Sequence, residues 1–226
     1  FRTVRKQPLP FYHITHKNFS NTGTETMNET SAAWAPHIAE CAPLHPAISP
    51  RSIQSYLDEA AASFGSRSAV IFQNLTYTYR QLKEKAETFA ASLRDHGLET
   101  GDRVAIMMPN LPQTIIAFWG ALKAGATVVM TNPLYMEKEL THHFQDSEPK
   151  FLITLDLFWE KIKPLQDRLN IQTYIVSRIA DGLAFPLSIL QPFQAKRQGH
   201  YPEVGFDGKT VIPWKTMMKT RRRYSE

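Results

Sequence analysis

The sequence predicts an α/β protein built on a mainly parallel sheet with flanking helices. Apolar runs typical of buried parallel strands recur at residues 104–107, 127–130, 151–154 and 174–177. Segments in which apolar residues recur at helical spacing lie between these runs. Strands that alternate with helices in this way join through right-handed crossovers around one sheet. We therefore expect an α/β subdomain over residues 51–180.

The first helix is predicted to begin after Ser52, a good N-cap residue, and to end at Gly65. Asp58 and Glu59 are expected on its outer, solvated face. Its apolar residues recur at helical spacing and are expected to be buried: Ile53, Tyr56, Leu57, Ala60, Ala61 and Phe64.

A short antiparallel pair is predicted next, from residues 69–72 and 75–77 with a turn between them. Thr78 then stands at the N-cap position of a second helix, which Gly97 ends. Gln81 lies three residues after Thr78, so the two should form a capping box. Capping explains these polar residues without assigning them a catalytic role.

The third helix is predicted to begin at Pro112 and to end at Gly125. It is apolar nearly all round, so we expect it to be buried between other layers. A membrane span is the rival interpretation, but the run is shorter than the ~20 residues that a span requires. Lys123 also interrupts it. Further helices are expected over residues 137–145 and 157–169.

The regular alternation ends after Ile179, and residues 181–226 are predicted to form an irregular, truncated extension that contains a hairpin. Within it, residues 183–193 are apolar but interrupted by two prolines, and residues 205–212 resemble a hairpin. A helix should begin at residues 214–218. At the other end, residues 1–50 are rich in Pro, Thr, Asn and His, and we expect them to be extended or disordered.

The net charge of +5 is concentrated in residues 1–26 and 194–226, and the body between them is mildly acidic. Nucleic-acid-binding proteins gather cationic residues on a folded face, so this pattern argues against a nucleic-acid partner. Cys41 is the only cysteine, which excludes an intrachain disulfide and a thiolate metal cluster and fits a reducing cytoplasm. Met27 could be the natural start, and Arg221–Arg223 are expected to form a solvated end.

Two segments imitate a phosphate-binding P-loop. Residues 120–125 have its two glycines, but Ala126-Thr127 replace the required Lys and Ser/Thr. Gly208-Lys209-Thr210 match its end, but Glu203 stands where its first glycine should be. Neither segment is expected to hold a triphosphate.

Metal-binding patterns are equally weak. His142 and His143 are adjacent, so on a helix their side chains point about 100° apart and do not share a metal. We therefore predict no catalytic, cofactor-binding or metal-binding residue in this chain.

Five segments resemble adenylate-forming enzymes of the AMP-dependent synthetase/ligase superfamily. The first three are LTYTYRQL at residues 75–82, the segment 97–135 with its LKAGA and NPLY pieces, and ELTHHFQDSEPKFLI at residues 139–153. Residues 181–199 and 201–211 are similar to the bacterial long-chain fatty-acid–CoA ligases in particular. The resemblance implies part of the large N-terminal domain of an acyl-activating enzyme.

The same resemblance implies a two-step reaction for the complete enzyme. A fatty acid attacks the α-phosphate of ATP to form an acyl-adenylate, and the thiol of CoA then displaces AMP. The complete enzyme would need ATP, Mg²⁺ and CoA. Its Ser/Thr/Gly-rich phosphate loop is expected beyond Trp214, and Thr22–Glu25 imitate its Mg²⁺-binding segment at the wrong place in the order. We therefore expect this chain to bind none of these cofactors and to be inactive alone.

Two alternatives remain open. The chain could belong to another adenylate-forming ligase, or it could be a non-enzymatic or degraded product. In the non-enzymatic case residues 183–193, with Lys196 and Arg197, could touch a lipid surface. The expected location is the cytoplasm, with peripheral contact at the inner membrane as an addition.

Overall fold

The structure is a computed structural model, and it describes residues 51–197, 199 and 202–219. The predictions on Met27, Cys41, Thr22–Glu25 and Arg221–Arg223 lie outside these residues.

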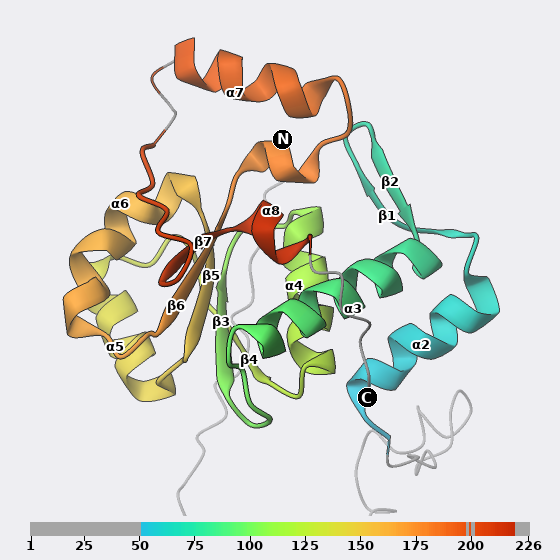
Figure 1. The fold of residues 1–226 in the computed structure, drawn as a ribbon, viewed down its shortest axis with the longest axis horizontal. Coiled ribbons are helices and arrows are strands. Elements are labelled where there is room, and N and C mark those ends of the chain that lie inside the picture. The colour runs from blue at the N-terminus through green and yellow to red at the C-terminus, as the bar shows by residue number, and fades with distance from the viewer. Residues whose placement is uncertain (1–50, 198, 200–201, 220–226) are drawn as a thin grey trace, which may run out of the picture. The chain divides into compact units, whose positions relative to one another are not determined.

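A five-stranded parallel sheet forms the centre of the described chain (Figure 1). Its strands run in the spatial order β4-β3-β5-β6-β7, and every neighbouring pair is parallel. The predicted mainly parallel sheet is thus confirmed. The strands are β3 (Arg103–Met107), β4 (Thr127–Met130), β5 (Phe151–Leu155), β6 (Thr173–Ser177) and β7 (Val211–Pro213).

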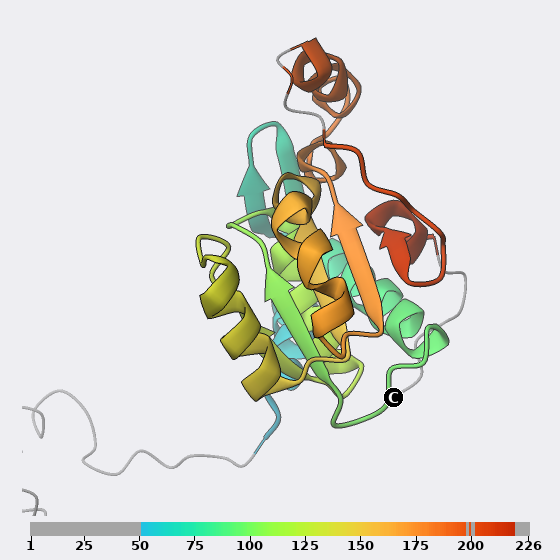
Figure 2. The same cartoon turned by 90° about the vertical axis from the view of Figure 1, so that its left-hand side faces the viewer.

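Helices cover both faces of this sheet, as Figures 1 and 2 show. On one face lie α3 (Tyr79–Asp95), α4 (Pro112–Lys123) and α8 (Trp214–Met217), with α2 (Ile53–Phe64) packed against α3 and α4. The other face carries α5 (Glu137–Ser147), η2 (Asp156–Phe158), α6 (Trp159–Ile162) and η3 (Lys163–Arg168).

Two hydrophobic clusters result, because successive side chains of a strand point to opposite faces. Ile106 and Ile153 belong to the cluster under α3 and α4, together with Phe89. Met107 and Leu152 belong to the cluster under α5 and α6. Both faces of each central strand are therefore buried, which explains why these strands are continuous apolar runs.

The predicted N-terminus of α3 is confirmed. The Thr78 hydroxyl accepts the amide of Gln81 at 3.3 Å, and the Gln81 side-chain oxygen accepts the amide of Thr78 at 3.0 Å. Thr78 also ends the antiparallel hairpin of β1 (Ser68–Phe72) and β2 (Leu75–Thr78). Pro112 begins α4, and Gly125 follows its end with a φ of +84°.

The prediction for α2 was wrong in its orientation. Leu57 and Ala61 are buried, but Ile53, Tyr56 and Phe64 are exposed. Asp58 does not lie on the outer face; it faces Lys123 of α4. The Ser52 side chain forms no capping hydrogen bond. The spacing predicted one apolar stripe, and the helix turns only part of it inward because an inward carboxylate pairs with the buried lysine.

Three later predictions also need correction. The expected hairpin at residues 205–212 is instead an irregular segment followed by β7, which pairs in parallel with β6. The helix expected at residues 157–169 is broken into η2, α6 and η3, with Pro164 at the start of η3.

The third correction concerns the apolar segment with two prolines. It forms an α-helix, α7 (Leu187–Arg197), which follows a short 3₁₀ turn, η4 (Ile179–Gly182), and contains Pro192 in its interior. None of the helices in the described ranges combines the length and apolarity that crossing a bilayer requires.

Candidate functional site at the carboxyl ends of β5 and β6

Polar side chains gather where the chain leaves the central strands β5 and β6. Asp156 directly follows β5, Ser177 ends β6, and Arg178 and Asp181 belong to the turn that follows. β3 has β4 on one side and β5 on the other, and the helices after β3 and β5 cover opposite faces. Ligands of open α/β sheets bind at the carboxyl ends of strands beside such a reversal of strand order. This place is therefore the candidate site.

Two carboxylates, those of Asp156 and Asp181, make most of the polar contacts in this cluster. The Arg178 Nε lies 3.5 Å from Oδ2 of Asp156, whose Oδ1 accepts the amide of Leu157 at 2.9 Å. Oδ2 of Asp181 accepts the backbone amide of Arg178 at 2.8 Å and the Ser177 hydroxyl at 3.4 Å. Lys215 of α8 lies 3.4 Å from the other oxygen of Asp181. The cluster thus links β5, β6 and the segment after β7.

Gln113, in the first turn of α4, completes the cluster from the opposite side. Its amide nitrogen donates to the Arg178 carbonyl at 3.0 Å and to the Ser177 hydroxyl at 3.3 Å. Its side-chain oxygen is buried and has no hydrogen-bond partner among the described residues. A Cβ atom on Gly182 would lie 2.2 Å from that oxygen, so only glycine fits there. Gln113 therefore sets the position of the η4 turn.

Burial raises the pKa of Asp156 to about 6, and the nearby Arg178 guanidinium only partly opposes this effect. Asp156 is 6% exposed. A carboxyl group with such a pKa exists in both protonation states near neutral pH and can hold or release a proton. It pairs, however, with the Leu157 amide and the Arg178 guanidinium, and neither of these groups is a nucleophile.

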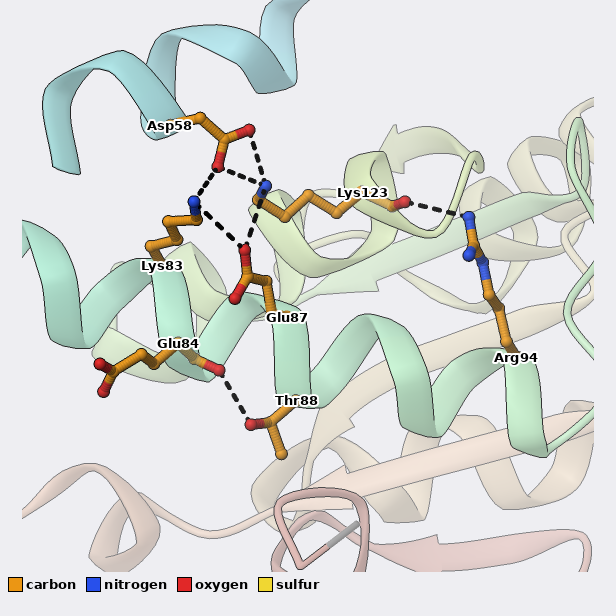
Figure 3. A network of polar contacts seen from close by, with 7 residues as sticks. All are labelled: Asp58, Lys83, Glu84, Glu87, Thr88, Arg94 and Lys123. Carbon is orange, nitrogen blue, oxygen red and sulfur yellow. Dashed lines mark hydrogen bonds and ion pairs between the residues drawn. The ribbon is translucent and has the colours of Figure 1, made fainter. Parts of the chain in front are cut away.

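A second polar network lies between α2, α3 and α4 (Figure 3). The Lys123 ammonium lies 2.7 and 2.8 Å from the two oxygens of Asp58 and 3.7 Å from Glu87. Lys83 lies 3.1 Å from Asp58 and 3.6 Å from Glu87. Two cations and two anions alternate here, so the network fastens three helices together. Its four charges compensate one another, which is the arrangement expected of a structural network.

A shallow pocket of about 390 Å³ lies beside this network. It is lined by Asp58, Lys123, Arg94 and Gly125, with serines and Gln54 of the α2 end. Arg94 donates to the Lys123 carbonyl at 3.4 Å. The Lys123 ammonium and the Arg94 guanidinium that line this pocket both make contacts between helices, so we assign no ligand to the pocket.

The structure places both P-loop imitations in positions that do not fit a triphosphate. Gly120 lies inside α4, where an added Cβ atom would lie 2.8 Å from the ring of Phe89. Beyond it, the amides of Ala124 and Gly125 bond to carbonyls of the same helix. At the other segment, Oδ1 of Asp207 accepts the amides of Lys209, Thr210 and Val211, each at 2.8 Å. A carboxylate of the chain itself thus occupies the amides that a phosphate would need.

Of the adjacent histidines of α5, His143 contacts the end of the neighbouring strand. The Nε2 of His143 lies 3.1 Å from the Thr131 hydroxyl, next to the carboxyl end of β4. Both histidines line a surface pocket of about 270 Å³ together with Tyr135, Glu139 and Asp146. Within the described residues, no group of three or more His, Cys, Asp or Glu side chains could hold a metal ion.

The cluster of Asp156, Arg178, Asp181 and Gln113 was not predicted from the sequence. A signal for part of it existed, because Asp156 and Arg178 directly follow buried strands, where the side chains of parallel strands converge. Gln113 gave no such signal, since it lies at the start of an apolar helix far from the others in sequence.

Comparison with known proteins identifies the family. Residues 57–204 match the family model described as "AMP-binding enzyme". Over 150 residues the chain is 38% identical to a long-chain-fatty-acid–CoA ligase of Bacillus subtilis (strain 168), covering 66% of this chain and 27% of that protein. It is 35% identical over 153 residues to a long-chain-fatty-acid–CoA ligase of Escherichia coli O157:H7. The match to bacitracin synthase 3 of Bacillus licheniformis is 33% over 111 residues, or 49% of this chain and 2% of that protein.

A solved structure supports the fold. A putative long-chain-fatty-acid CoA ligase from Rhodopseudomonas palustris CGA009 superimposes with a TM-score of 0.60 at 18% identity, covering 77% of this chain and 38% of that chain. The chain resembles the N-terminal part of the ligases and spans about a quarter of the length of the curated ligases that it matches. Because the family model matches well over half of its residues, the chain belongs to the AMP-binding enzyme family.

Proposed function

We propose that this chain is the N-terminal part of a long-chain fatty-acid–CoA ligase. The supporting observation is the 38% identity over 150 residues to a curated ligase of that specificity. The complete enzyme would use ATP, Mg²⁺ and CoA to convert a fatty acid into its CoA thioester. The fold alone would not single out fatty acids, because an anthranilate CoA ligase has a similar fold.

The contribution of this chain to the reaction is a scaffold. Its two glycine-containing segments do not fit a triphosphate, because Phe89 crowds one and the Asp207 carboxylate fills the other. We therefore propose that these residues do not bind ATP. The role proposed for them is to build the sheet and the polar cluster at its carboxyl ends, against which the rest of the enzyme is assembled.

Two assays test this proposal. The purified chain is expected to catalyse no palmitate-dependent exchange between pyrophosphate and ATP; measurable exchange would refute the scaffold role. In the second assay, the matching quarter of the Bacillus subtilis ligase is replaced by this chain. The chimera is expected to form palmitoyl-CoA.

The matched control for the chimera carries the corresponding segment of bacitracin synthase 3 instead, which is also similar to this chain. That control is expected to make no palmitoyl-CoA, and palmitoyl-CoA synthesis by the control at the rate of the chimera would count against the proposed specificity. A soluble, folded chimera without activity would also count against the proposal.

We also propose a cytoplasmic location with peripheral contact to the inner membrane. The observation in its favour is the set of large apolar side chains exposed on and before α7, next to basic residues. Fatty acids partition into bilayers, so a ligase that touches the membrane would meet its substrate there.

A further inference from the structure

Two acidic side chains are buried at the carboxyl ends of β5 and β6. The side chain of Asp156 is 8% exposed and that of Asp181 is 7% exposed. The cations recorded beside them keep more contact with water, since the side chain of Arg178 is 31% exposed and that of Lys215 is 70% exposed. Water screens the charge of a hydrated cation, so it compensates a buried carboxylate incompletely. Ionising both carboxyl groups therefore costs more here than it does in water.

The two carboxyl groups are not paired equally well. Oδ2 of Asp181 accepts the amide of Arg178 at 2.8 Å, and its other oxygen lies 3.4 Å from the ammonium of Lys215. Asp156 accepts the amide of Leu157 at 2.9 Å, but its Oδ2 lies 3.5 Å from the Arg178 Nε, at the outer limit of a hydrogen bond. The cost of ionisation therefore falls mainly on Asp156. Burial, and to a smaller extent the charge of Asp181, raise the pKa of Asp156 to about 6.

Arg178 connects Asp156 to both ends of the segment that carries α7, the helix that projects beyond the carboxyl ends of the strands (Figure 1). Arg178 directly precedes η4, and its carbonyl accepts the amide of Asp181 and the side chain of Gln113, each at 3.0 Å. Its guanidinium lies 5.9 Å from the ring centre of Phe206, in the segment that returns from α7 to β7. A change of charge at Asp156 therefore acts where this segment leaves the sheet and where it returns.

We propose that η4 is a pH-dependent switch, closed while Asp156 carries a proton and open to water after Asp156 loses it. Asp156 directly follows β5, a strand paired on both sides with β3 and β6, and is held in place by them. By contrast, η4 is a single 3₁₀ turn of four residues. Short elements of this kind open at a lower free-energy cost than central strands do. The turn is therefore the part that moves to hydrate the carboxylate.

Proton linkage sets the direction of the change. A carboxyl group in water has an ordinary pKa of 3.8, and that of Asp156 under the closed turn is about 6. Between these pH values the closed state holds more protons, so a rise in pH favours the open state. The ratio of open to closed molecules should grow about tenfold per pH unit and about a hundredfold in all. The charged groups recorded around Asp156 are Arg178 and Asp181, with Lys215 of α8 beside Asp181.

Hydrogen exchange of the 226-residue chain between about pH 4 and about pH 7 tests the switch. Dividing each rate by that of an unstructured peptide at the same pH gives the opening equilibrium. The amides of Arg178, Asp181 and Leu183 report on η4, because they bond to the Asp181 carboxylate and to carbonyls within the turn. Their opening should increase about a hundredfold over this range. Amides of β3 and β5, which open only with the whole sheet, should not show this increase.

Three variants separate the switch from a general effect of pH. Asp156→Asn should remove the pH dependence of η4 opening, because the asparagine still accepts the Leu157 amide and does not titrate. Arg178→Gln should extend the pH dependence above about pH 6, since the guanidinium opposes the rise in the pKa of Asp156. Asp146→Asn is the matched control: it removes an exposed carboxylate from α5 and should behave as the parent does.

Opening of the η4 amides that stays constant or decreases as the pH rises would overturn the proposal. A pH response that Asp156→Asn retains would do the same. If the η4 amides follow those of β3 and β5 at every pH, the proton acts on the whole sheet and the turn is not a switch. The carboxyl carbon signal of Asp156 in NMR should titrate near pH 6, and titration near pH 4 would remove the cause proposed here. These measurements involve no substrate, so their outcome is independent of the proposed function.

Discussion

The ammonium of Lys123 lies 2.7 Å from Oδ1 of Asp58, and the lysine side chain is 1% exposed while that of the aspartate is 27% exposed. The two partners are therefore not equivalent. Asp58 keeps water and Lys83 if it loses Lys123, whereas the carboxylate of Glu87 lies farther from the buried Lys123 ammonium, at 3.7 Å. Burial alone would raise the pKa of Asp58, but the hydrogen bonds from Lys123 and Lys83 outweigh it and hold that pKa below its usual range.

This asymmetry predicts different costs for the two truncations. Asp58→Ala should lower the free energy of unfolding by about 3 kcal/mol, because it leaves a buried ammonium poorly compensated. Lys123→Met should cost less than about 1 kcal/mol, since a methionine fills the same space without a charge. Urea unfolding followed by tryptophan fluorescence measures both.

The double variant Asp58→Leu/Lys123→Met is the control, and its stability should lie close to that of the parent. Equal costs for Asp58→Ala and Lys123→Met would show that the difference in burial does not matter.

The raised pKa of Asp156 predicts an unusual pH dependence of the free energy of unfolding. Its pKa in the folded state is about 6, above the ordinary 3.8, so the folded state holds more protons between these pH values. The stability that this group contributes is therefore complete below about pH 3.8 and is lost as the pH rises through about 6. The loss amounts to at most about 3 kcal/mol.

Asp156→Asn should remove this loss, because the asparagine carbonyl can still accept the Leu157 amide and carries no charge to bury. The variant should be more stable than the parent at pH 7 and no more stable at pH 4. The difference between the two proteins is the quantity to measure, since the lowered pKa values of Asp58 and Asp102 give the opposite trend in both. A difference that does not change with pH would contradict the raised pKa.

The contact between Gly182 and Gln113 predicts a steric cost. Gly182→Ala places a methyl group 2.2 Å from the Gln113 side-chain oxygen, so the buried amide has to give up its hydrogen bonds to Ser177 and Arg178. We expect a loss of about 1–3 kcal/mol in the free energy of unfolding. Thermal unfolding monitored by circular dichroism measures it.

Gly205→Ala is the matched control, since nothing lies within 4 Å of the added atom, and it should change stability by less than about 0.5 kcal/mol. Gln113→Ala should relieve part of the Gly182→Ala cost. If Gly182→Ala is as stable as Gly205→Ala, the turn is not set by this contact.

Trp214 predicts how strongly the segment after β7 is held. Its ring stacks on that of Phe89 with centroids 4.7 Å apart, and it is 3% exposed. Trp214→Ala should cost about 3–5 kcal/mol, and Trp214→Phe should cost clearly less because it keeps the stack. Hydrogen exchange of the β7 amides should become faster in Trp214→Ala, and unchanged exchange would show that β7 is held by its pairing with β6 alone.

Much of the fold was predictable because a strand that is buried on both faces is a continuous apolar run in the sequence. The strands β3, β5 and β6 are continuous apolar runs, and Thr78 with Gln81 is a local pattern that does not depend on tertiary contacts. The parallel pairing of β7 with β6 was not predictable in this way. Val211 and Ile212 are separated from Tyr174 and Ile175 by the whole α7 segment, and nothing local indicates a partner that distant.

The wrong orientation predicted for α2 and the missed polar cluster have a common cause. Helical spacing shows that Asp58 and the apolar residues of α2 lie at certain angles, but only the partner Lys123, from another helix, decides which angle faces inward. The cluster around Asp156 likewise joins side chains from four separate segments. Charged groups recruited from distant elements leave no pattern at any single period, so the sequence does not reveal them.

The parallel pairing of β6 with β7 fixes Ser177 and Val211 in neighbouring strands, and η4 and α7 lie entirely between them. The cost of closing a chain segment grows only with the logarithm of its length, so halving this excursion would change the closure free energy by only about 0.6 kcal/mol. Evolution can therefore lengthen, shorten or reshape the projecting helix with little penalty to the sheet beneath. The pairing of β6 with β7 would hold equally well around a longer, shorter or differently folded segment.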